Sequence, residues 1–574
     1  MTLPFFTSLA GYRGEWLRGD VLAGLTVWAV LVPEALAYAS IAGVSPVVGL
    51  YAAPGALLLY AAFGSSKHLV TGPMSATAAL SAAAVAQFAT QGSGEFAALT
   101  VTLALTTGLV ALVAGLLRLG FLANFISEPV LKGFIIGLAL TIVAGQLPEL
   151  FGVEKGGGDF FEELWDLLGR LDETSGLTLL VGLVSLAVVV GLRRYAPAVP
   201  GSLVAVLLGI AVVGAFSLDQ HGVAIVGQID SGLPSIGLPN VEAADYLELV
   251  PSGVGVMLVG FAEGLGAAKT YAARHHYEVD ANRELLGLGA ANLGAGLSSG
   301  MVVNGSLSKT AVNGAAGART QLSGLVVAAL TVVTLLFLTG LFEELPKATL
   351  AAVVIAAVVE LVDVSALVDL YRLGTRQLRR IYGVAARPDF IAALAALAGV
   401  LVFDTLPGLF IGIAVSFALL VYRASHPHIA VLGEVAGSGG QYVDVGRHPE
   451  NRQEPGVVIL RVEGGLFFAN ADAIRDSIRR HAAEPGTRAV VLDAETVPFV
   501  DVSAARMLGL LAADLQRQGV QLLFARDVGQ VRDVLARAER DRPLVRAYPT
   551  VRDAVEAARH APAPSPAQGE DDAR

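Results

Sequence analysis

The 574-residue sequence contains no cysteine, and only 16% of its residues are charged. Without cysteine the chain has no disulfide, no thiolate metal ligand and no thiol nucleophile. The low fraction of charged residues is more informative, because soluble domains usually carry about 25% charged residues. Between Val21 and Lys67 the only ionised side chain is Glu34. A soluble chain would have to enclose roughly 400 such residues in one core, beyond the size at which single cores stop growing. The composition therefore excludes an ordinary soluble globular protein.

Apolar runs of about 20 residues, the length that crosses about 30 Å of hydrocarbon, recur from Val21 to Arg423. They predict a cytoplasmic N-terminal segment at 1–20 and a polytopic α-helical membrane domain at 21–425. The fourteen predicted spans are 21–40, 46–63, 73–89, 97–117, 121–145, 176–192, 199–217, 250–269, 284–299, 305–316, 320–340, 347–362, 389–403 and 407–422. The third and the tenth are too short, or too interrupted by Gly and Pro, to be ordinary spans.

The charges in the loops alternate in sign along the predicted membrane domain. Loops after even-numbered spans contain Arg and Lys, as at Arg193 and Arg194 or in the segment 372–387, whereas the loop after the fifth span is acidic from Glu149 to Glu173. Cytoplasmic loops carry the excess of Lys and Arg. Both termini are therefore expected in the cytoplasm, and the expected location is a bacterial inner (plasma) membrane.

The two halves of the predicted membrane domain resemble each other. Val32–Ala37 in the first span aligns with Phe261–Gly266 in the eighth, which matches Glu34 with Glu263. About forty residues later each half has a Gly-containing break, at 71–77 and 304–310. Seven spans per half is an odd number, so the halves have opposite orientations. Paired breaks in inverted repeats point to the binding site of a transporter.

A helix that begins at such a break presents free backbone N–H groups and the positive end of its dipole, which together bind anions. The sequence thus predicts an anion site at the two breaks. The alternative is that both breaks are ordinary ends of short helices.

Three charged residues are predicted to lie inside the membrane, where each costs roughly 2.5–3.5 kcal/mol at a span centre. Glu34 and Glu263 are candidate proton carriers, and Lys309 would attract an anionic substrate. The alternatives are a structural ion pair between Glu263 and Lys309, and a solvated vestibule around Glu34. Tyr38, one turn after Glu34, either lines the cavity or packs in the core. Outside this set, Glu128 and Lys132 are four residues apart and are expected to pair.

Residues 426–560 have the composition of a soluble α/β domain. Strands are expected at 457–462, 489–493 and 520–525, helices at 471–481, 504–518 and 530–538, and a disordered acidic tail at 561–574. The domain has no metal cluster, no Gly-rich phosphate loop and no evident nucleophile. We therefore expect no cofactor, no metal, no nucleic-acid partner and no enzymatic activity.

Several motifs resemble the sulfate-permease (SulP) family of anion transporters, and the C-terminal region resembles a STAS domain. The matching segments are Arg18–Thr26, Val32–Ala39, Gly49–Tyr51, Gly72-Pro73 with Ser75, Ala318–Gly324 and, in the STAS region, Phe467–Asn470. The resemblance implies a 7+7 inverted repeat, a core domain that moves against a gate domain in an elevator-like manner, and a homodimer. It places the anion between the starts of spans three and ten, lined by Tyr38, Met74, Ser75, Ser306, Ser308 and Lys309.

The chain departs at two places from the patterns that it resembles. Many relatives have arginine at the position of Lys309, so the cation is kept but the bidentate fork is lost. In the Asp501-Val502-Ser503 stretch Val502 occupies the place of the serine that is phosphorylated in soluble STAS proteins. We predict no phosphorylation there and expect Ser503 to cap a helix.

The expected function is secondary active transport of a small anion such as sulfate, a dicarboxylate or bicarbonate, by H⁺-coupled symport. By resemblance Glu34 is the carboxylate linked to proton coupling, and Glu263 lies where sodium-coupled bicarbonate transporters use an aspartate. A Na⁺-coupled bicarbonate symporter is therefore one alternative. The other is an anion sensor or scaffold that binds without turnover.

Overall fold

The computed structural model describes residues 5–121, 127–156, 160–196, 199–229, 231–359, 362–372, 387–403, 405–538 and 546–560. The chain divides into two compact units. The first comprises residues 1–373 and 389–416, and the second comprises 374–388 and 417–574. The predicted tail at 561–574, and Arg376, Arg379 and Arg380 of the basic loop, lie outside the described residues.

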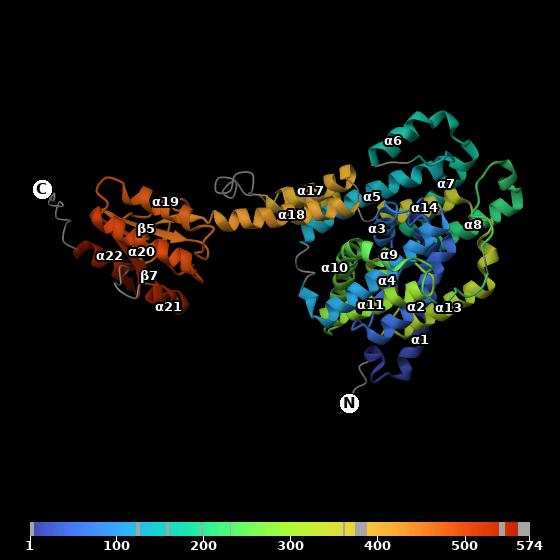
Figure 1. The fold of residues 1–574 in the computed structure, drawn as a ribbon, viewed down its shortest axis with the longest axis horizontal. Helices are drawn as coiled ribbons and strands as arrows, with labels where there is room; N and C mark the ends of the chain where they lie inside the picture. The colour runs from blue at the N-terminus through green and yellow to red at the C-terminus, as the bar shows by residue number, and fades with distance from the viewer. Residues whose placement is uncertain are drawn as a thin grey trace. The chain divides into compact units, whose positions relative to one another are not determined.

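The described residues of the first unit form helices and one short pair of strands (Figure 1). The helices are α1 (Leu17–Ile41), α2 (Pro46–Phe63), α3 (Ser75–Val85), α4 (Gly94–Leu116), α5 (Glu128–Phe151), α6 (Phe160–Gly169), α7 (Gly176–Tyr195), α8 (Gly201–Phe216), α9 (Ala243–Glu248), α10 (Val250–Arg274), α11 (Ala281–Leu297), α12 (Leu307–Ala315), α13 (Leu322–Phe337), α14 (Lys347–Val359), α15 (Val364–Arg372) and α17 (Pro388–Phe403); α18 (Thr405–Ser425) continues into the second unit. The strands are β1 (Val70–Gly72) and β2 (Asn304–Ser306).

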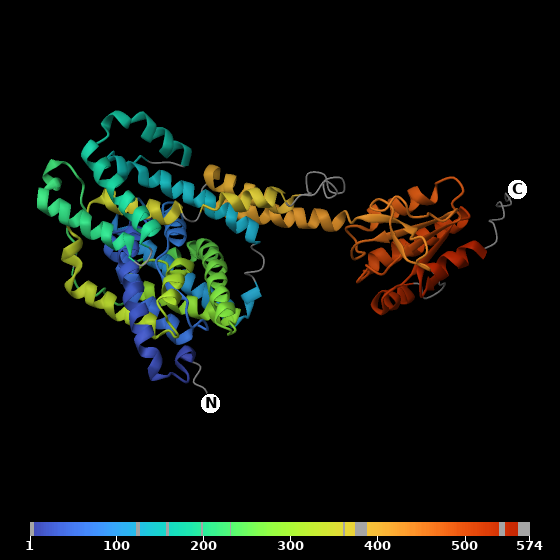
Figure 2. The same cartoon turned by 180° about the vertical axis from the view of Figure 1, so that it is seen from behind.

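Helices from the two halves of the sequence pack against each other. In one group α2 and α4 lie against α11, α1 and α2 lie against α13, and α4 lies against α10, as both views show (Figures 1 and 2). In a second group α5, α7 and α8 pack with α14. Contacts of α1 with α8 and α14, and of α3 with α5, join the groups.

A helix overlaps each of the fourteen predicted spans. Eight of the described helices are long and apolar enough to cross a membrane by length and composition. The third and tenth segments contain the short helices α3 and α12, of 11 and 9 residues. The fifth helix runs from Glu128 to Phe151 rather than over 121–145, because Ser127 caps its start by accepting from the Val130 N–H and Gly152, with positive φ, ends it. The short helices α6, α9 and α15 were not predicted.

Close packing of α1 on α2 depends on Gly49. A Cβ at this position would overlap the backbone carbonyl oxygen of Ala35. The Gly49→Ala variant must therefore push α1 and α2 apart, and overpacking of this kind costs about 1–3 kcal/mol. We expect a lower thermal unfolding temperature and reduced anion uptake, because α1 also carries Glu34.

Gly191→Ala in α7 is the matched control, since nothing lies within 4 Å of the Cβ it would add. Unfolding followed by fluorescence-detected size exclusion compares the two variants. Equal stability of both would show that α1 and α2 do not approach as closely as described.

The second unit contains a six-stranded sheet with strand order β4-β3-β5-β6-β7-β8. The strands are β3 (Ile429–Glu434), β4 (Tyr442–Asp444), β5 (Val457–Val462), β6 (Ala489–Asp493), β7 (Gln521–Ala525) and β8 (Arg546–Tyr548); the helices are α19 (Ala471–Ala482), α20 (Val502–Arg517), α21 (Gly529–Ala538) and α22 (Val551–His560). Strands β5 to β8 are parallel, and β3 is antiparallel to both β4 and β5. Helices α19, α20 and α21 supply the core on one face of the sheet, and α22 supplies it on the other.

The predicted strands and helices of this unit are confirmed, but the sequence did not predict β3, β4, β8 or α22. The expected cap of α20 was wrong. Asp501, not Ser503, caps the helix, because its Oδ1 accepts from the Ala504 N–H at 2.8 Å and α20 already begins at Val502. Ser503 lies in the first turn and cannot be the cap. The carboxylate also accepts from the Phe468 N–H at 2.9 Å, which joins the starts of α19 and α20.

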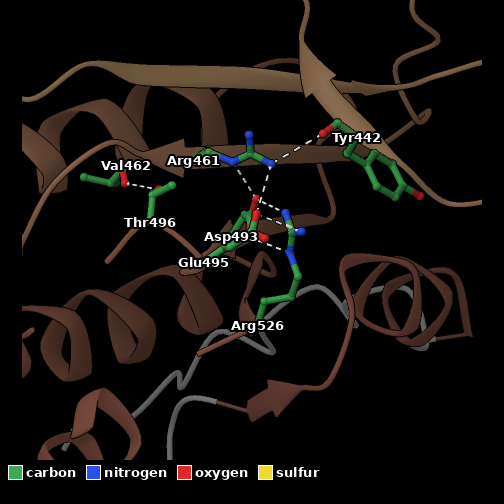
Figure 3. Close-up of polar contacts among 7 residues, drawn as sticks. All are labelled: Tyr442, Arg461, Val462, Asp493, Glu495, Thr496 and Arg526. Carbon is green, nitrogen blue, oxygen red and sulfur yellow. Dashed lines mark hydrogen bonds and ion pairs between the residues drawn. The ribbon is translucent and has the colours of Figure 1, made fainter. Parts of the chain in front are cut away.

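A buried carboxylate lies where three parallel strands end (Figure 3). Asp493, the last residue of β6, is fully buried and forms ion pairs with Arg461 at 2.7 Å and Arg526 at 2.6 Å. Glu495 also contacts Arg526, at 2.8 Å. Arg526 adopts φ +57°, a left-handed conformation that non-glycine residues seldom take, and its bonds to Asp493 hold it there. This network fastens β5, β6 and the end of β7 together.

Candidate functional site

The two predicted breaks meet in space. Strand β1 pairs antiparallel with β2, with Val70 opposite Ser306, Thr71 opposite Gly305 and Gly72 opposite Asn304. Each strand leads into a short helix, β1 into α3 and β2 into α12. Segments 234 residues apart in the sequence thus form one two-stranded ladder from which two helices start, with strands of opposite direction as an inverted repeat requires.

The start of α3 is left open for a ligand. Met74 holds the N-cap position in an extended conformation and makes no side-chain cap, so the first amides of α3 point out of the helix without a capping side chain. Ser75 is buried at this start, and Met74 is partly exposed. An anion placed here would accept N–H groups that the helix itself does not use.

The start of α12 is capped but hydroxyl-rich. Ser306 Oγ accepts from the Lys309 N–H at 3.2 Å and lies 3.1 Å from Ser308 Oγ. Thr310 Oγ1 donates to the Ser306 carbonyl at 2.5 Å and accepts from the Val70 N–H at 3.1 Å, so it ties α12 to β1. Ser308 is exposed, which makes its hydroxyl available to a ligand.

Lys309 connects the two breaks and α1. Its side chain is only 1% exposed, and its Nζ lies 2.7 Å from Glu34 Oε2. The same ammonium group donates to the Pro73 carbonyl at 3.1 Å and lies 5.1 Å from the centre of the Tyr38 ring. A buried ammonium is stable only when it is paired and hydrogen-bonded. Glu34, Pro73 and Tyr38 supply these contacts from α1 and from the break before α3.

The site residues that the sequence predicts therefore lie around the ammonium group of Lys309, with one exception. Lys309, Ser306 and Ser308 lie at the start of α12, Met74 and Ser75 at the start of α3, and Tyr38 faces Lys309 from α1. Glu263 is the exception: among the described residues, Lys309 forms its ion pair with Glu34 and not with Glu263. The Glu263 Oε2 is buried without a hydrogen-bond partner among the described residues. The alternative of a Glu263–Lys309 pair and the alternative of a solvated Glu34 are both wrong, because Glu34 is buried and holds the ammonium itself.

Two further buried carboxylates support the site, and the sequence reasoning missed both. Asp20 at the start of α1 accepts from the backbone N–H groups of Arg319 and Thr320, at 2.6 and 3.1 Å, and from the Thr320 hydroxyl at 2.7 Å. These residues belong to two motifs that the sequence had already singled out. The sequence does not show that the two motifs contact each other, so it could not identify Asp20 as a buried carboxylate.

The second is Glu284 in α11, which is fully buried. It accepts from the Tyr60 hydroxyl at 2.7 Å and from the backbone N–H groups of Ser65 and Ser66, at 2.8 and 3.0 Å. It therefore fixes the loop between α2 and β1 to the second half of the chain. Its place at the first residue of the ninth predicted span was the only signal for it.

The expected pair of Lys132 with Glu128 is confirmed at 2.8 Å, on the surface of α5.

Within the part of the chain that the structure describes, no three His, Asp or Glu side chains are placed to hold a metal ion. The chemistry available at the site is therefore a buried cation, hydroxyl groups and uncapped backbone amides. This set fits a small anion and offers little to a neutral or cationic ligand.

Family models match both parts of the chain. The model of the sulfate permease family matches residues 17–381, and the model of the STAS domain matches residues 448–554. The "Probable sulfate transporter MT1781" of Mycobacterium tuberculosis is 39% identical over 537 residues, which cover 93% of this chain and 94% of the relative. The "Probable sulfate transporter 4.2" of Arabidopsis thaliana is 32% identical over 557 residues, covering 93% of this chain and 80% of the relative.

Solved structures share the fold. The murine Solute Carrier 26 family member A9 anion transporter superimposes with a TM-score of 0.86 at 22% identity, covering 96% of this chain and 93% of that protein. The transmembrane domain of the cyanobacterial bicarbonate transporter BicA superimposes with a TM-score of 0.59 at 24% identity, covering 70% and 98%. The relatives are transporters rather than enzymes. The chain therefore belongs to the sulfate permease family of anion transporters and carries a STAS domain in its C-terminal part.

Proposed function

We propose that the chain is a proton-coupled symporter of a small oxyanion, with Lys309 as the cation of its binding site. The single observation that supports this most is the Glu34–Lys309 pair, 2.7 Å long and buried at the starts of α3 and α12. Sulfate, a dicarboxylate and bicarbonate all fit the chemistry of this site. The relatives named as sulfate transporters favour sulfate.

The pair suggests how a proton and an anion would be coupled. While Glu34 is ionised, its carboxylate occupies the ammonium group that an anion would use. Protonation of Glu34 frees one unit of positive charge at the start of α12, and the anion then binds beside the uncapped amides of α3. Release of the anion and of the proton reverses these steps. Glu263, with one buried oxygen lacking a described partner, is the candidate second proton carrier.

The same proposal includes the architecture around the site. The membrane domain extends over residues 21–425 with fourteen spans as a 7+7 inverted repeat, and the STAS domain over 426–560. The group of α1, α2, α4, α10, α11 and α13 forms the core that moves in an elevator-like manner against the gate of α5, α7, α8 and α14. The protein acts as a homodimer in a bacterial plasma membrane with both termini in the cytoplasm.

Uptake into proteoliposomes tests the function. Radiolabelled sulfate, fumarate, bicarbonate and chloride are offered with and without an inward proton gradient, and again with sodium. Accumulation of one anion that follows the proton gradient supports the proposal. Accumulation that requires sodium would favour a Na⁺-coupled bicarbonate symporter, and binding without accumulation would favour a sensor.

The Glu34→Gln variant tests the coupling step. Glutamine has the shape of the protonated acid and cannot hold Lys309 as an anion does, so anion uptake should lose its dependence on pH while anion binding persists. The measurement is the initial rate of uptake between acidic and neutral pH, with Glu263→Gln examined in parallel.

Glu128→Gln is the control, because Glu128 also pairs with a lysine but does so on the surface. This variant should keep the pH profile of the unmodified protein. If Glu34→Gln and Glu263→Gln both kept that profile as well, proton coupling through these carboxylates would be refuted.

A further inference from the structure

Three apolar side chains are exposed side by side at the starts of α19 and α20. Phe468 is 74% exposed, Val502 is 60% exposed and Phe499 is 43% exposed. We call these three residues the apolar tip of the STAS domain. Exposed single apolar side chains are common, but two aromatic rings and a valine gathered at one end of a small domain mark an interaction surface.

The apolar tip is held rigidly. The Leu466 N–H donates to the Phe499 carbonyl at 3.0 Å, and the Phe468 N–H donates to Asp501 Oδ2 at 2.9 Å. The ring of Phe467 lies 6.2 Å from that of Phe499. These contacts fix the two loops to each other while the apolar side chains remain outside. A surface that is already ordered loses little entropy when it is buried against a partner.

The apolar tip lies beside the last turn of α18. The side chain of Asn470 is buried; its Nδ2 donates to the Ala424 carbonyl at 3.1 Å and to the Gly465 carbonyl at 2.8 Å, while its Oδ1 accepts from the Phe467 N–H at 3.0 Å. Ala424 belongs to the last turn of α18, a helix of 21 residues. At about 1.5 Å per residue this helix is about as long as the hydrocarbon layer is thick.

We propose that the apolar tip inserts into the interfacial layer of the lipid bilayer at the end of α18. The last turns of α18 expose Phe417, Leu420, Val421 and Tyr422, so the apolar surface of the span reaches to within three residues of Ala424. Aromatic side chains are enriched at this depth of a membrane.

Two basic side chains lie near the apolar tip, together with the carboxylates of Asp472 and Asp501. Arg423 lies in the last turn of α18, and Arg506 is exposed one turn after Val502 on the same face of α20. Each basic side chain near an anionic membrane surface contributes about 1 kcal/mol of attraction. The proposal depends on α18 being a span of a membrane transporter, and not on which anion is carried.

The absence of cysteine allows a direct test in the full-length protein. Phe468→Cys, Val502→Cys, Leu510→Cys and Val421→Cys are each labelled with a nitroxide and reconstituted into liposomes that contain anionic lipid. Collision rates of the label with O₂, which dissolves in lipid, and with a water-soluble nickel chelate are measured by electron paramagnetic resonance. Leu510 is the control, since it is 74% exposed on α20 but two turns, about 12 Å, beyond Val502.

At position 468 we expect O₂ collisions to exceed nickel collisions, as at the lipid-facing position 421, and the reverse at position 510. More nickel than oxygen collisions at 468 would overturn the proposal, because the tip would then be in water. Low rates for both reagents would also overturn it in favour of a protein contact, either with the membrane domain or with a second copy. Anion uptake by each labelled protein verifies folding, and Val502→Cys replaces Phe468→Cys if that variant fails to fold.

Discussion

Replacement of Lys309 by methionine is expected to abolish anion uptake. The variant keeps the length and the apolar stem of the side chain but removes the ammonium group that contacts Glu34 and Pro73. In the proposed mechanism the anion pairs with this ammonium group, and loss of one partner from a buried, hydrogen-bonded charge pair costs about 2–5 kcal/mol. Since about 1.4 kcal/mol corresponds to a factor of ten, the affinity for the anion should fall at least about 30-fold. Binding is measured by isothermal titration and transport by uptake into proteoliposomes.

Three further variants separate binding from folding. The double variant Lys309→Gln with Glu34→Gln leaves no unpaired charge, so it should be as stable as the unmodified protein and still fail to transport. Lys309→Arg keeps the cation and should retain binding. Lys132→Met removes a surface cation whose pair is worth less than about 1 kcal/mol, and it should transport normally. Full uptake by Lys309→Met would show that the anion does not bind at this residue.

Replacement of Asp493 by asparagine is expected to destabilise the STAS domain strongly. The variant leaves Arg461 and Arg526 without the buried carboxylate that both contact (Figure 3). Removal of one partner from such a buried network costs about 3–5 kcal/mol. Because the two arginines are partly exposed, we expect about 3 kcal/mol, which makes amide exchange in β5 and β6 about 100-fold faster. Hydrogen exchange followed by mass spectrometry of the full-length protein measures this rate.

Asp514→Asn is the matched control. Asp514 also contacts two arginines, Arg479 and Arg517, at 2.8 and 3.2 Å, but these pairs lie on the surface. Surface pairs contribute about 0–1 kcal/mol, so exchange in the sheet should hardly change. Equal exchange rates in the two variants would mean that the buried network does not hold the strands. Peptides from α1 and α12 should exchange at the same rate in both variants, because the change is confined to the other unit.

The sequence predicted those features that depend on periodicity and composition. Long apolar runs separated by charged loops indicated the helices, and a helix overlaps each of the fourteen segments. The Gly-containing breaks indicated two short helices, and α3 and α12 are short. In the STAS domain the continuous apolar strands β5, β6 and β7 were predicted correctly, because strands buried on both faces have a strong local pattern.

The two strands at the edges of the sheet were missed for the opposite reason. The strands β4 and β8 have three residues each, which is too short for an apolar pattern to emerge. Half of the ten residues of helix α22 are exposed, and its buried positions are alanine and valine. The cap of α20 was misplaced because Asp501 and Ser503 are both good capping residues, and only the position of the first turn distinguishes them.

The sequence by itself determined that this is a membrane protein with paired broken helices, three charged residues within its apolar segments and a C-terminal α/β domain. These follow from the free energy of placing side chains in hydrocarbon, which depends on residue type and spacing alone. Only the tertiary structure decided which carboxylate holds Lys309. Glu34 and Glu263 occupy equivalent places in the two repeats, so their local sequences cannot distinguish them. The antiparallel pairing of β1 with β2 brings Lys309 to the Pro73 carbonyl, and the packing of α1 against α12 places Glu34 within 2.7 Å of its ammonium group.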